Sequence, residues 1–396
     1  MFDLRSDTVT KPNKDIISTA LTAELGDDEY AEDKTVNDLQ EHCANLLGFE
    51  AGLFVTSGLQ GNQISLLIHT DPGNEVITLF DSHIKNYEHG AASFLSRIQF
   101  RDIDHINGLP DLNTLDLILK KSKVHKPLIS CLTLENTHLA SGGSIVSYLE
   151  LEKIYKFAKT NNLNVHIDGA RIWHAIIEEN NTQDYGSVCD SLTFCFSKGL
   201  GAPIGSMLLG SKDFISKARE YRKILGGGMR QVGVIAAMAR KALDNRIELL
   251  NDHNKARKVY NILKTELENQ DFISKLTYQG TNMVFIEINN QFKPELFLDE
   301  LYYNLIIAGL INENTVRLVF HKDIHETDIE TISNKILYSS SKFWFHSVID
   351  FSDRLINTIV PIIPIALAKN MYEVSVRLQF SFKLKRQNVL PSKYPI

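Results

Sequence analysis

The stretch that decides the fold is FCFSKGLGAPIGSMLLGS, at residues 194–211. The apolar run at 191–196 predicts a strand buried on both faces of a sheet, because it offers no polar face to water. Lys198 follows that strand closely, and Gly199 and Gly201 come after it. Ligands of open α/β sheets gather at the carboxyl ends of the strands. We therefore expect Lys198 at a ligand-binding edge, on a turn whose glycines let the backbone approach a ligand closely.

On both sides of this stretch, short apolar runs, turns rich in Gly, Asp or Ser, and helix-period segments alternate. That alternation is typical of βαβ units and predicts an α/β fold with a mostly parallel sheet. The chain has no internal repeat on the scale of roughly 20 to 50 residues, which excludes solenoids. The expected strands lie at 52–56, 75–79, 128–134, 164–167, 191–196 and 205–209, with an amphipathic covering helix at 149–160.

The second half of the chain predicts a change of domain. A long helical pattern follows the triple glycine at 226–228 and resembles a connecting helix. Beyond it, strand-like runs at 283–288 and 315–320 alternate with helical patterns. We expect a large domain at 1–250 and a small α+β domain at 251–344.

Residues 345–396 differ in composition and are expected to form an appended segment. They hold four of the ten prolines, and seven Lys or Arg against three Asp or Glu, on a chain whose net charge is −6. The apolar stretch at 355–368 has 14 residues and two internal prolines, which is too short and too interrupted to span a bilayer. Two interpretations stay open: a surface contact with a membrane or a subunit, or an extension that packs on the body or is partly disordered.

The overall composition excludes several classes of protein. A chain of 396 residues with 42 Lys plus Arg and 48 Asp plus Glu is acidic, which argues against binding to nucleic acid. Its four cysteines lie in separate segments without a CxxC pair, so we expect neither a disulfide framework nor a metal site. The opening residues MFDLRSDTVTKP contain no apolar signal segment. Together these features predict a cytoplasmic protein.

Asp168 and Lys198 form the most informative pair of candidate site residues. Asp168, in NVHIDGARIWHA, follows an apolar strand as Lys198 does. A lysine at such a position is placed to form a Schiff base, and a nearby carboxylate can keep a pyridine nitrogen protonated. Both are needed to bind and activate pyridoxal phosphate. Taken alone, each has a plainer interpretation, as a solvated lysine and as a helix N-cap aspartate.

Further polar residues fall near expected strands. Ser57 and Gly58 precede a helical pattern whose first amides suit a phosphate. Arg171 and Arg317 are flanked by apolar sequence, and a buried guanidinium group needs a carboxylate, either from a substrate or from an internal ion pair.

Two histidines and one cysteine also attract interest. His83 and His138 follow expected strands, where an imidazole can stack on a cofactor ring or move protons. Cys195, inside the strand before Lys198, is expected to fill the core rather than to react.

These residues belong to a series of motifs that resembles one family, the low-specificity L-threonine aldolases among the pyridoxal-phosphate enzymes of the aspartate aminotransferase fold type. The motifs follow the family's order over most of the chain, which makes the resemblance highly specific. They are LRSDTVTKP at 4–12, GDDEYAEDKTVNDL at 26–39, SHIKNYEHGA at 82–91, LENTH at 134–138, HIDGAR at 166–171, SKGLGAPIGS at 197–206, GGGMRQ at 226–231 and RLVFH at 317–321.

The resemblance implies the fold-type-I architecture, with a mostly parallel seven-stranded sheet in the large domain and a small α+β C-terminal domain. It also implies a lyase of amino-acid metabolism and glycine biosynthesis that cleaves L-threonine or L-allo-threonine to glycine and an aldehyde. We expect a homotetramer, a dimer of dimers with shared active sites. The alternatives are β-elimination or transamination on the same fold, or a non-catalytic protein that binds a partner through its tail.

The resemblance also assigns roles to individual residues. Lys198 would hold the cofactor covalently, Asp168 would face its pyridine nitrogen and His83 would stack on its ring. His138 would lie near the substrate hydroxyl. The cofactor phosphate would be held by Ser57, Gly58, the amide of Leu59 and, from a neighbouring subunit, Arg230. The substrate carboxylate would be held by Ser6, Arg171 and Arg317.

Three positions depart from the family pattern. Leu59 stands where Thr or Ser is usual, so one hydroxyl group to the phosphate is missing. Leu139 replaces a common Asn and Phe320 a common Thr, which predicts a different shape around the substrate side chain. Whether the proton of the substrate hydroxyl goes to His83, to His138 or to a water stays open.

Overall fold

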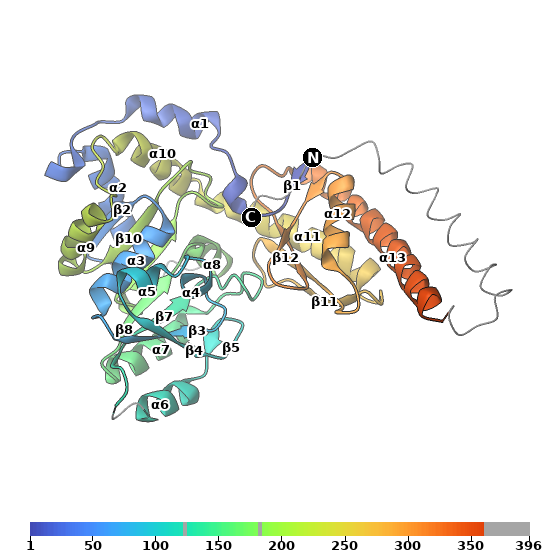
Figure 1. Cartoon of the computed structure of the whole chain (residues 1–396). Helices are drawn as coiled ribbons and strands as arrows, with labels where there is room; N and C mark the ends of the chain where they lie inside the picture. The colour runs from blue at the N-terminus through green and yellow to red at the C-terminus, as the bar shows by residue number, and fades with distance from the viewer. Residues whose placement is uncertain (122–124, 181–183, 360–396) are drawn as a thin grey trace.

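A seven-stranded sheet forms the centre of the large domain (Figure 1). The computed structural model describes residues 1–121, 125–180 and 184–359. The strand order is β2-β10-β9-β8-β7-β3-β4; β10 runs antiparallel to both of its neighbours, and the other pairs are parallel. The expected α/β architecture is confirmed. The strands span Ala51–Val55 (β2), Glu75–Leu79 (β3), Gln99–Ile103 (β4), Ile129–Glu135 (β7), Asn164–Asp168 (β8), Ser191–Cys195 (β9) and Ser206–Gly210 (β10).

Six of the seven strands lie where the apolar runs predict them, to within one residue at each end. The seventh, β4, has the sequence QFRDI and pairs only with β3, at the edge of the sheet. β4 lacks the continuous apolar run that marks the other strands. Accordingly, only Ile103 of this strand is buried.

Helices cover both faces of the sheet. On one face, α2 (Lys34–Leu47), α7 (Tyr148–Thr160) and α10 (Gly233–Asp244) contribute to the largest hydrophobic core. On the other face, α3 (Gly58–His69) and α9 (Lys212–Ile224) pack on β2 and β10 through a separate apolar cluster. A sheet covered in this way has strands that are apolar on both sides, as the sequence indicates.

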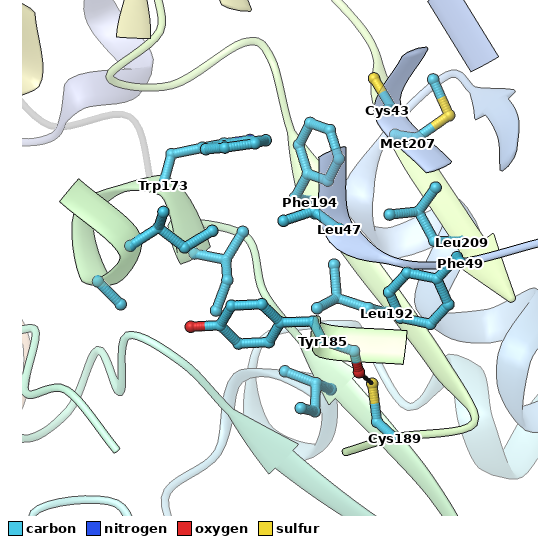
Figure 2. Packing of buried hydrophobic residues seen from close by; sticks show 14 of the residues in the cluster. Cys43, Leu47, Phe49, Trp173, Tyr185, Cys189, Leu192, Phe194, Met207 and Leu209 are labelled. Carbon is cyan, nitrogen blue, oxygen red and sulfur yellow. Dashed lines mark hydrogen bonds between the residues drawn. The ribbon is translucent and has the colours of Figure 1, made fainter. Parts of the chain in front are cut away.

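Figure 2 shows part of the largest core around the two strands that flank the Lys198 turn. Leu192 and Phe194 of β9 are fully buried, as are Met207 and Leu209 of β10. Burying one such side chain stabilises the fold by roughly 1.5–3 kcal/mol. The turn between β9 and β10 is therefore anchored at both ends.

The small domain is built on a four-stranded antiparallel sheet with the order β11-β12-β15-β14. Its core gathers Phe272, Phe297 and Phe343, whose ring centroids lie 5.1 to 6.3 Å apart. Its elements span Leu249–Leu267 (α11), Ile273–Thr277 (β11), Met283–Ile288 (β12), Pro294–Tyr303 (α12), Gly309–Leu310 (β14), Thr315–Val319 (β15) and Ile329–Ile359 (α13).

The expectation of one long helix after the triple glycine is wrong. α10 ends at Asp244, a 3-10 turn occupies Arg246–Glu248, and α11 then begins a new helix. Asp244 and Asn245 favour this break, because short polar side chains compete with helical backbone hydrogen bonds.

The boundary expected between residues 344 and 345 falls inside α13, which runs through it without a break. From residue 360 onward, the basic and apolar tail lies outside the described residues. Among the residues that the structure does describe, no helix combines the length and the apolar character needed to cross a membrane.

The N-terminal segment joins the two domains. β1 (Phe2–Asp3) pairs in parallel with β13 (Ile306–Ile307), and the backbone N–H of Val319 donates to the carbonyl oxygen of Leu4 at 2.8 Å. Further along, α1 (Lys14–Ser18) packs on α10 of the large domain. The residues between β1 and α1 are therefore held at the junction of the domains, as the path of the chain in Figure 1 shows.

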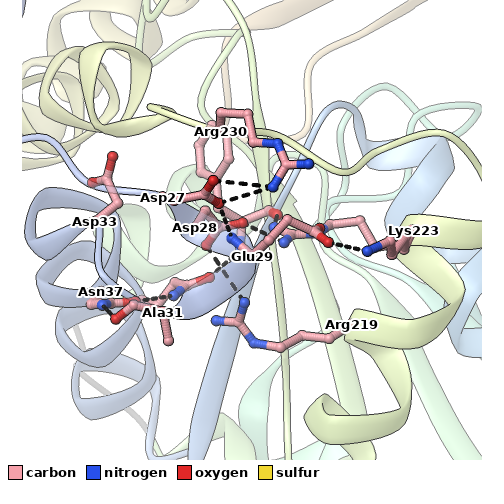
Figure 3. Close-up of polar contacts among 12 residues, drawn as sticks. Asp27, Asp28, Glu29, Ala31, Asp33, Asn37, Arg219, Lys223 and Arg230 are labelled. Carbon is pink, nitrogen blue, oxygen red and sulfur yellow. Dashed lines mark hydrogen bonds and ion pairs between the residues drawn. The ribbon is translucent and has the colours of Figure 1, made fainter.

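A buried ion pair ties the N-terminal region to the large sheet at Asp28, whose surroundings Figure 3 shows. Asp28 accepts a hydrogen bond from Arg222, and both side chains are almost completely buried. Arg222 Nη1 also donates to the carbonyl oxygen of Phe54 on β2, at 2.8 Å. Because Asp28→Ala would leave Arg222 as an unpaired buried charge, we expect it to lower the free energy of unfolding by about 3–5 kcal/mol in a urea titration.

The neighbouring pair of Asp27 and Arg230 supplies a matched control. Its N–O distance is 3.0 Å, but 61% of the Arg230 side chain is exposed. Exposed pairs contribute about 1 kcal/mol or less, so Asp27→Ala is expected to change stability little. Similar losses for the two alanine variants would contradict the difference that burial predicts.

Candidate active site

Asp168 and Lys198 lie at the carboxyl edge of the large sheet. Asp168 is the last residue of β8, and Lys198 follows the end of β9 by three residues. The two strands are parallel neighbours, with Asp168 opposite Thr193 in the register. The fold therefore brings together the two residues that the sequence pattern selects.

Asp168 is a buried carboxylate that its neighbours keep ionised. Its Oδ2 accepts a hydrogen bond from Asn62 Nδ2 at 2.9 Å, and its Oδ1 accepts one from the backbone N–H of Ala170 at 3.1 Å. Burial alone would raise the pKa of Asp168, but the charges of His83 and Lys198 help lower it below its usual value. Such a carboxylate is suited to face a cationic ring nitrogen.

His83 lies between two buried carboxylates. Its Nδ1 is 3.2 Å from Glu88 Oε1 and 3.8 Å from Asp168 Oδ2. Burial alone would lower the pKa of His83, but the hydrogen bond with Glu88 and the charge of Asp168 outweigh it and raise the pKa. Burial and the nearby Asp168 charge raise the pKa of Glu88. Since 32% of the His83 side chain stays exposed, part of its imidazole remains accessible for stacking.

The N-terminus of α3 supplies open amides next to β9. Ser57 caps this helix, because its Oγ accepts a hydrogen bond from the Gln60 N–H at 3.1 Å. Within the described parts of the chain, the N–H groups of Gly58 and Leu59 have no acceptor. A Cβ on Gly58 would lie only 2.8 Å from Cys195 Sγ, so a glycine is needed where the helix meets the strand. Open amides at a helix N-terminus suit a phosphate group.

Arg171 is already paired with a residue of the N-terminal segment. Its Nε and Nη2 donate to the two carboxylate oxygens of Asp7, at 2.8 and 2.5 Å. Burial alone would raise the pKa of Asp7, but Arg171 holds it well below its usual range. Thr10 Oγ1 lies 3.1 Å from the carbonyl oxygen of Lys198, and Ser6 Oγ lies 3.5 Å from Asp7 Oδ1. The internal ion pair that the sequence left open for Arg171 is therefore present.

Arg317, on β15, keeps donors available. Its Nη2 donates to the carbonyl oxygen of Arg5 at 2.9 Å, whereas its Nε is buried without a partner among the described residues. Burial and the nearby charge of Arg171 lower the pKa of Arg317 to about 10, against the opposing effect of Asp7. A guanidinium group with an unpaired N–H in such surroundings is well suited to bind a carboxylate.

His138 lies on the turn after β7 and is fully buried. Glu135 links this turn to the segment after β3 that begins at His83. Its Oε2 accepts a hydrogen bond from the His83 N–H at 2.8 Å, and its Oε1 accepts one from the Leu139 N–H at 2.9 Å. The Nε2 of His138 lies 3.3 Å from Asp81 Oδ1. Both predicted histidines thus belong to segments that one carboxylate holds together.

Several residues of this site were not singled out by the sequence analysis, among them Asp7, Asn62, Asp81, Glu88 and Glu135. Asp7 and Glu88 do lie inside the motifs LRSDTVTKP and SHIKNYEHGA, so the family resemblance was the signal that could have found them. Asn62 and Asp81 carry no comparable signal, because their partners are distant in sequence.

Three predicted positions have surroundings that bear on their roles. Arg230 pairs with Asp27 of its own chain, as Figure 3 shows, and its contact with a neighbouring subunit's cofactor stays a prediction. Phe320 is fully buried in the core of the small domain. Leu139 packs against the apolar cluster that includes Phe285 of β12.

Together, these residues fit pyridoxal phosphate. The site offers an amine on Lys198, an ionised buried carboxylate on Asp168 and a partly exposed imidazole on His83. The open amides of Gly58 and Leu59 complete it with a place for a phosphate. The unpaired Nε of Arg317 is a separate donor that is suited to a second anion.

The chain is similar in sequence and fold to known proteins. Residues 3–289 match the family model described as beta-eliminating lyase. The chain is 35% identical over 336 residues to the low specificity L-threonine aldolase of Escherichia coli (strain K12), covering 84% of this chain and 97% of that protein. It is 37% identical over 341 residues to the probable low-specificity L-threonine aldolase 2 of Arabidopsis thaliana, covering 83% and 94%. The crystal structure of a putative L-allo-threonine aldolase from Listeria monocytogenes has a similar fold, with a TM-score of 0.70, 19% identity and coverage of 85% and 96%.

Proposed function

Because the chain belongs to the beta-eliminating lyase family, whose enzymes use pyridoxal phosphate, we propose that it is a lyase that cleaves L-threonine and L-allo-threonine to glycine and acetaldehyde. Related L-β-hydroxy-α-amino acids would give glycine and the corresponding aldehyde. One observation carries the proposal: Asp168 and Lys198 end neighbouring strands, within electrostatic reach of each other, at the edge where ligands of such sheets bind.

The residues at the sheet edge would hold the cofactor. Lys198 would bind it covalently, Asp168 would keep its ring nitrogen protonated and His83 would cover its ring. Its phosphate would lie at the N-terminus of α3, against Ser57 and the amides of Gly58 and Leu59. When bound, pyridoxal phosphate supplies an electron sink for the electron pair released as the Cα–Cβ bond breaks.

Arg317 would bind the carboxylate of the amino acid through its unpaired Nε and a neighbouring N–H. Arg171, held by Asp7, adds positive charge near Arg317 and fixes the N-terminal segment beside it. Ser6 would add its hydroxyl from that same segment. With the carboxylate fixed, the bond to be broken is held in one orientation, which is the main contribution of these residues to the rate.

A histidine would remove the proton of the substrate hydroxyl. As this proton leaves, the hydroxyl oxygen becomes the aldehyde oxygen, and Cα later gains a proton to give glycine. We assign the proton to His138, because the Nδ1 of His83 already faces Glu88 and Asp168, whereas the Nδ1 of the buried His138 can be reached through the hydroxyl of Ser141, 2.9 Å away. His83 keeps its place at the cofactor ring.

Product analysis of the holoenzyme tests the proposal. Glycine and acetaldehyde should form in equal amounts from L-threonine or L-allo-threonine, and phenylserine should give benzaldehyde. Formation of 2-oxobutyrate and ammonia in place of glycine would show β-elimination instead. Accumulation of pyridoxamine phosphate would show transamination.

Changing Arg317 to lysine keeps the positive charge but removes the planar fork of donors. A charge-assisted contact of this kind is worth about 1.5–3 kcal/mol, which corresponds to a rise of about 10- to 100-fold in KM for L-threonine. Steady-state kinetics would measure it. Arg240→Lys, which alters an exposed pair with Asp244 on α10, is the control and should leave KM unchanged. An Arg317→Lys variant with the KM of the unaltered protein would show that Arg317 has only a structural role.

The proposed enzyme is a cytoplasmic homotetramer that contributes to glycine biosynthesis. Leu21, Tyr30 and Ile224 support assembly, because their side chains are 88%, 75% and 74% exposed and large apolar groups at a surface favour a partner. Glu29 and Lys223 form an ion pair, so Tyr30 and Ile224, which follow them in the sequence, lie near each other on one surface. All four cysteines are free and buried, which suits a reducing compartment.

A further inference from the structure

Asp81 and His105 form a carboxylate–imidazole pair beside His138. Neither residue has a role in the reaction proposed above. Asp81 Oδ1 lies 2.7 Å from His105 Nε2 and 3.3 Å from His138 Nε2. The three side chains come from separate segments: the turn after β3, the hairpin of β5 (His105–Ile106) and β6 (Leu109–Pro110), and the turn after β7. Nothing in their sequence spacing predicts this cluster.

The proton of His105 is fixed on one nitrogen. The backbone N–H of Gly108 donates to His105 Nδ1 at 3.0 Å, so this nitrogen carries the lone pair and Nε2 carries the proton. The ring also stacks on Phe80, with centroids 5.2 Å apart. His105 Nε2 therefore donates to Asp81.

This hydrogen-bond pattern argues against a metal ion at the cluster, although the three side chains lie close enough to surround one. A histidine that ligates a metal through Nε2 needs a proton on Nδ1, which it donates to an acceptor. The Nδ1 of His105 instead accepts a hydrogen bond from the N–H of Gly108, so it cannot carry the proton that metal binding through Nε2 requires. The cluster is accordingly a hydrogen-bonding network.

The network also fixes the tautomer of His138. The Nε2 of His138 is buried without a well-aligned hydrogen bond among the described residues, but the ionised carboxylate of Asp81, which can only accept, lies 3.3 Å from it, so Nε2 is the nitrogen that carries the proton. The Nδ1 of His138 is then the basic nitrogen, and it accepts the hydroxyl of Ser141 at 2.9 Å. Although burial alone would raise the pKa of Asp81, the two imidazoles hold it well below its usual range.

The backbone around His138 leaves the ring little freedom to turn. Its N–H donates to the carbonyl oxygen of Ser144 at 2.8 Å, and its carbonyl oxygen accepts from the N–H of Gly143 at 3.0 Å. Gly108 has a φ of +86°, and a Cβ there would lie 2.7 Å from the Cβ of His138. The hairpin that carries His105 thus packs directly against His138.

We propose that Asp81 and His105 are positioning residues, which hold His138 in the tautomer whose Nδ1 takes the proton of the substrate hydroxyl through Ser141. This inference rests on the proposed function. Ser141 Oγ gains the proton of the substrate hydroxyl as it passes its own proton to Nδ1, and the Nε2–H of the resulting imidazolium lies beside the carboxylate of Asp81. Asp81 therefore compensates the charge that develops on His138, as the aspartate of a Ser-His-Asp triad does for its histidine.

Asp81→Asn tests the proposal, because the amide can donate to His138 Nε2 and permit the opposite tautomer. We expect kcat for L-threonine to fall by about 10- to 100-fold, the scale on which such supporting partners act. KM should stay within about threefold, because Arg317 is unchanged. His105→Gln should lower kcat less, and also without a change in KM.

Glu300→Gln is the matched control. Glu300 pairs with the imidazole of His346 at 3.0 Å in the small domain, so this change removes a carboxylate from a similar pair away from the sheet edge. Both kcat and KM should stay those of the unaltered protein. An Asp81→Asn variant with unchanged kcat, or with the same effect as Glu300→Gln, would overturn the proposal.

A second measurement does not depend on activity. In protein labelled with 15N-histidine, long-range 1H–15N spectra show which ring nitrogen carries the proton, and a His138→Asn sample identifies the signals of His138. We expect Nε2–H in the unaltered protein and Nδ1–H in Asp81→Asn; Nδ1–H in the unaltered protein would overturn the inference. Failure of the proposed function would appear differently, as an absence of glycine from every β-hydroxy amino acid given to the unaltered holoenzyme.

Discussion

Replacing Lys198 by alanine is expected to abolish threonine cleavage, with a fall in kcat of about 10⁴-fold or more, the scale of losses when a covalent catalytic group is removed. Lys198 is fixed by the packing of β9 and β10 on either side of its turn, at the same edge as Asp168. In the proposed function, both the attachment and the orientation of the cofactor would depend on this amine. Lys198→Arg keeps the charge but cannot form the covalent bond, so it should be equally inactive.

Glycine formation in enzyme saturated with cofactor measures this effect. Lys212→Ala, at the exposed start of α9, is the matched control and should keep full activity. Circular dichroism would confirm that the Lys198 variants are folded. A folded Lys198→Ala protein that keeps more than about a tenth of the original kcat would contradict the role of Lys198 as a covalent catalytic group.

The second large effect is expected for Asp168→Asn. An asparagine can still accept the hydrogen bond of the Ala170 N–H, so the fold should survive, but the negative charge that would face the ring nitrogen is lost. Loss of a single preorganised electrostatic contact typically lowers kcat by about 10² to 10³. We expect a fall of at least about 10² in kcat, with an unchanged circular-dichroism spectrum.

Glu75→Gln separates this effect from the general cost of altering a buried carboxylate. Glu75 is the first residue of β3, so it lies at the amino end of the parallel strands, whereas Asp168 lies at the carboxyl end. The Oε2 of Glu75 lies 2.5 Å from the Nε of Arg101. Its loss should reduce stability and leave kcat unchanged. If Asp168→Asn, loaded with cofactor, turns over at the rate of Glu75→Gln, Asp168 does not maintain the charge of the ring.

The sheet and the strand ends that carry Asp168 and Lys198 could be predicted, because each apolar run and the polar residue after it are adjacent in the sequence. The runs before Asp168 and Lys198 are too apolar for a strand with one face in water, and β3 begins and ends at the residues that its run predicts. The edge strand β4 has no such apolar run, and only its Ile103 is buried. The break between α10 and α11 depends on two short polar residues that the helical period around them conceals.

The partners of the site residues could not be predicted in the same way. Asp7 and Arg171 are 164 positions apart, and only the crossing of the N-terminal segment between the domains brings them together. Asp81 and His138 follow β3 and β7, which are neighbours in the sheet but not in the chain. Sequence pattern shows which polar groups lie at strand ends; the strand order decides which of them meet.

The most direct test of the central claim, that the cofactor is bound covalently at Lys198, is borohydride reduction of the holoenzyme followed by peptide mass mapping. Reduction makes the bond between the cofactor and its lysine permanent. We predict that the pyridoxyl mass will be found on the peptide that contains Lys198, and that Lys198→Ala will carry none. A pyridoxyl group on another lysine, or on no lysine in protein saturated with cofactor, would contradict the account.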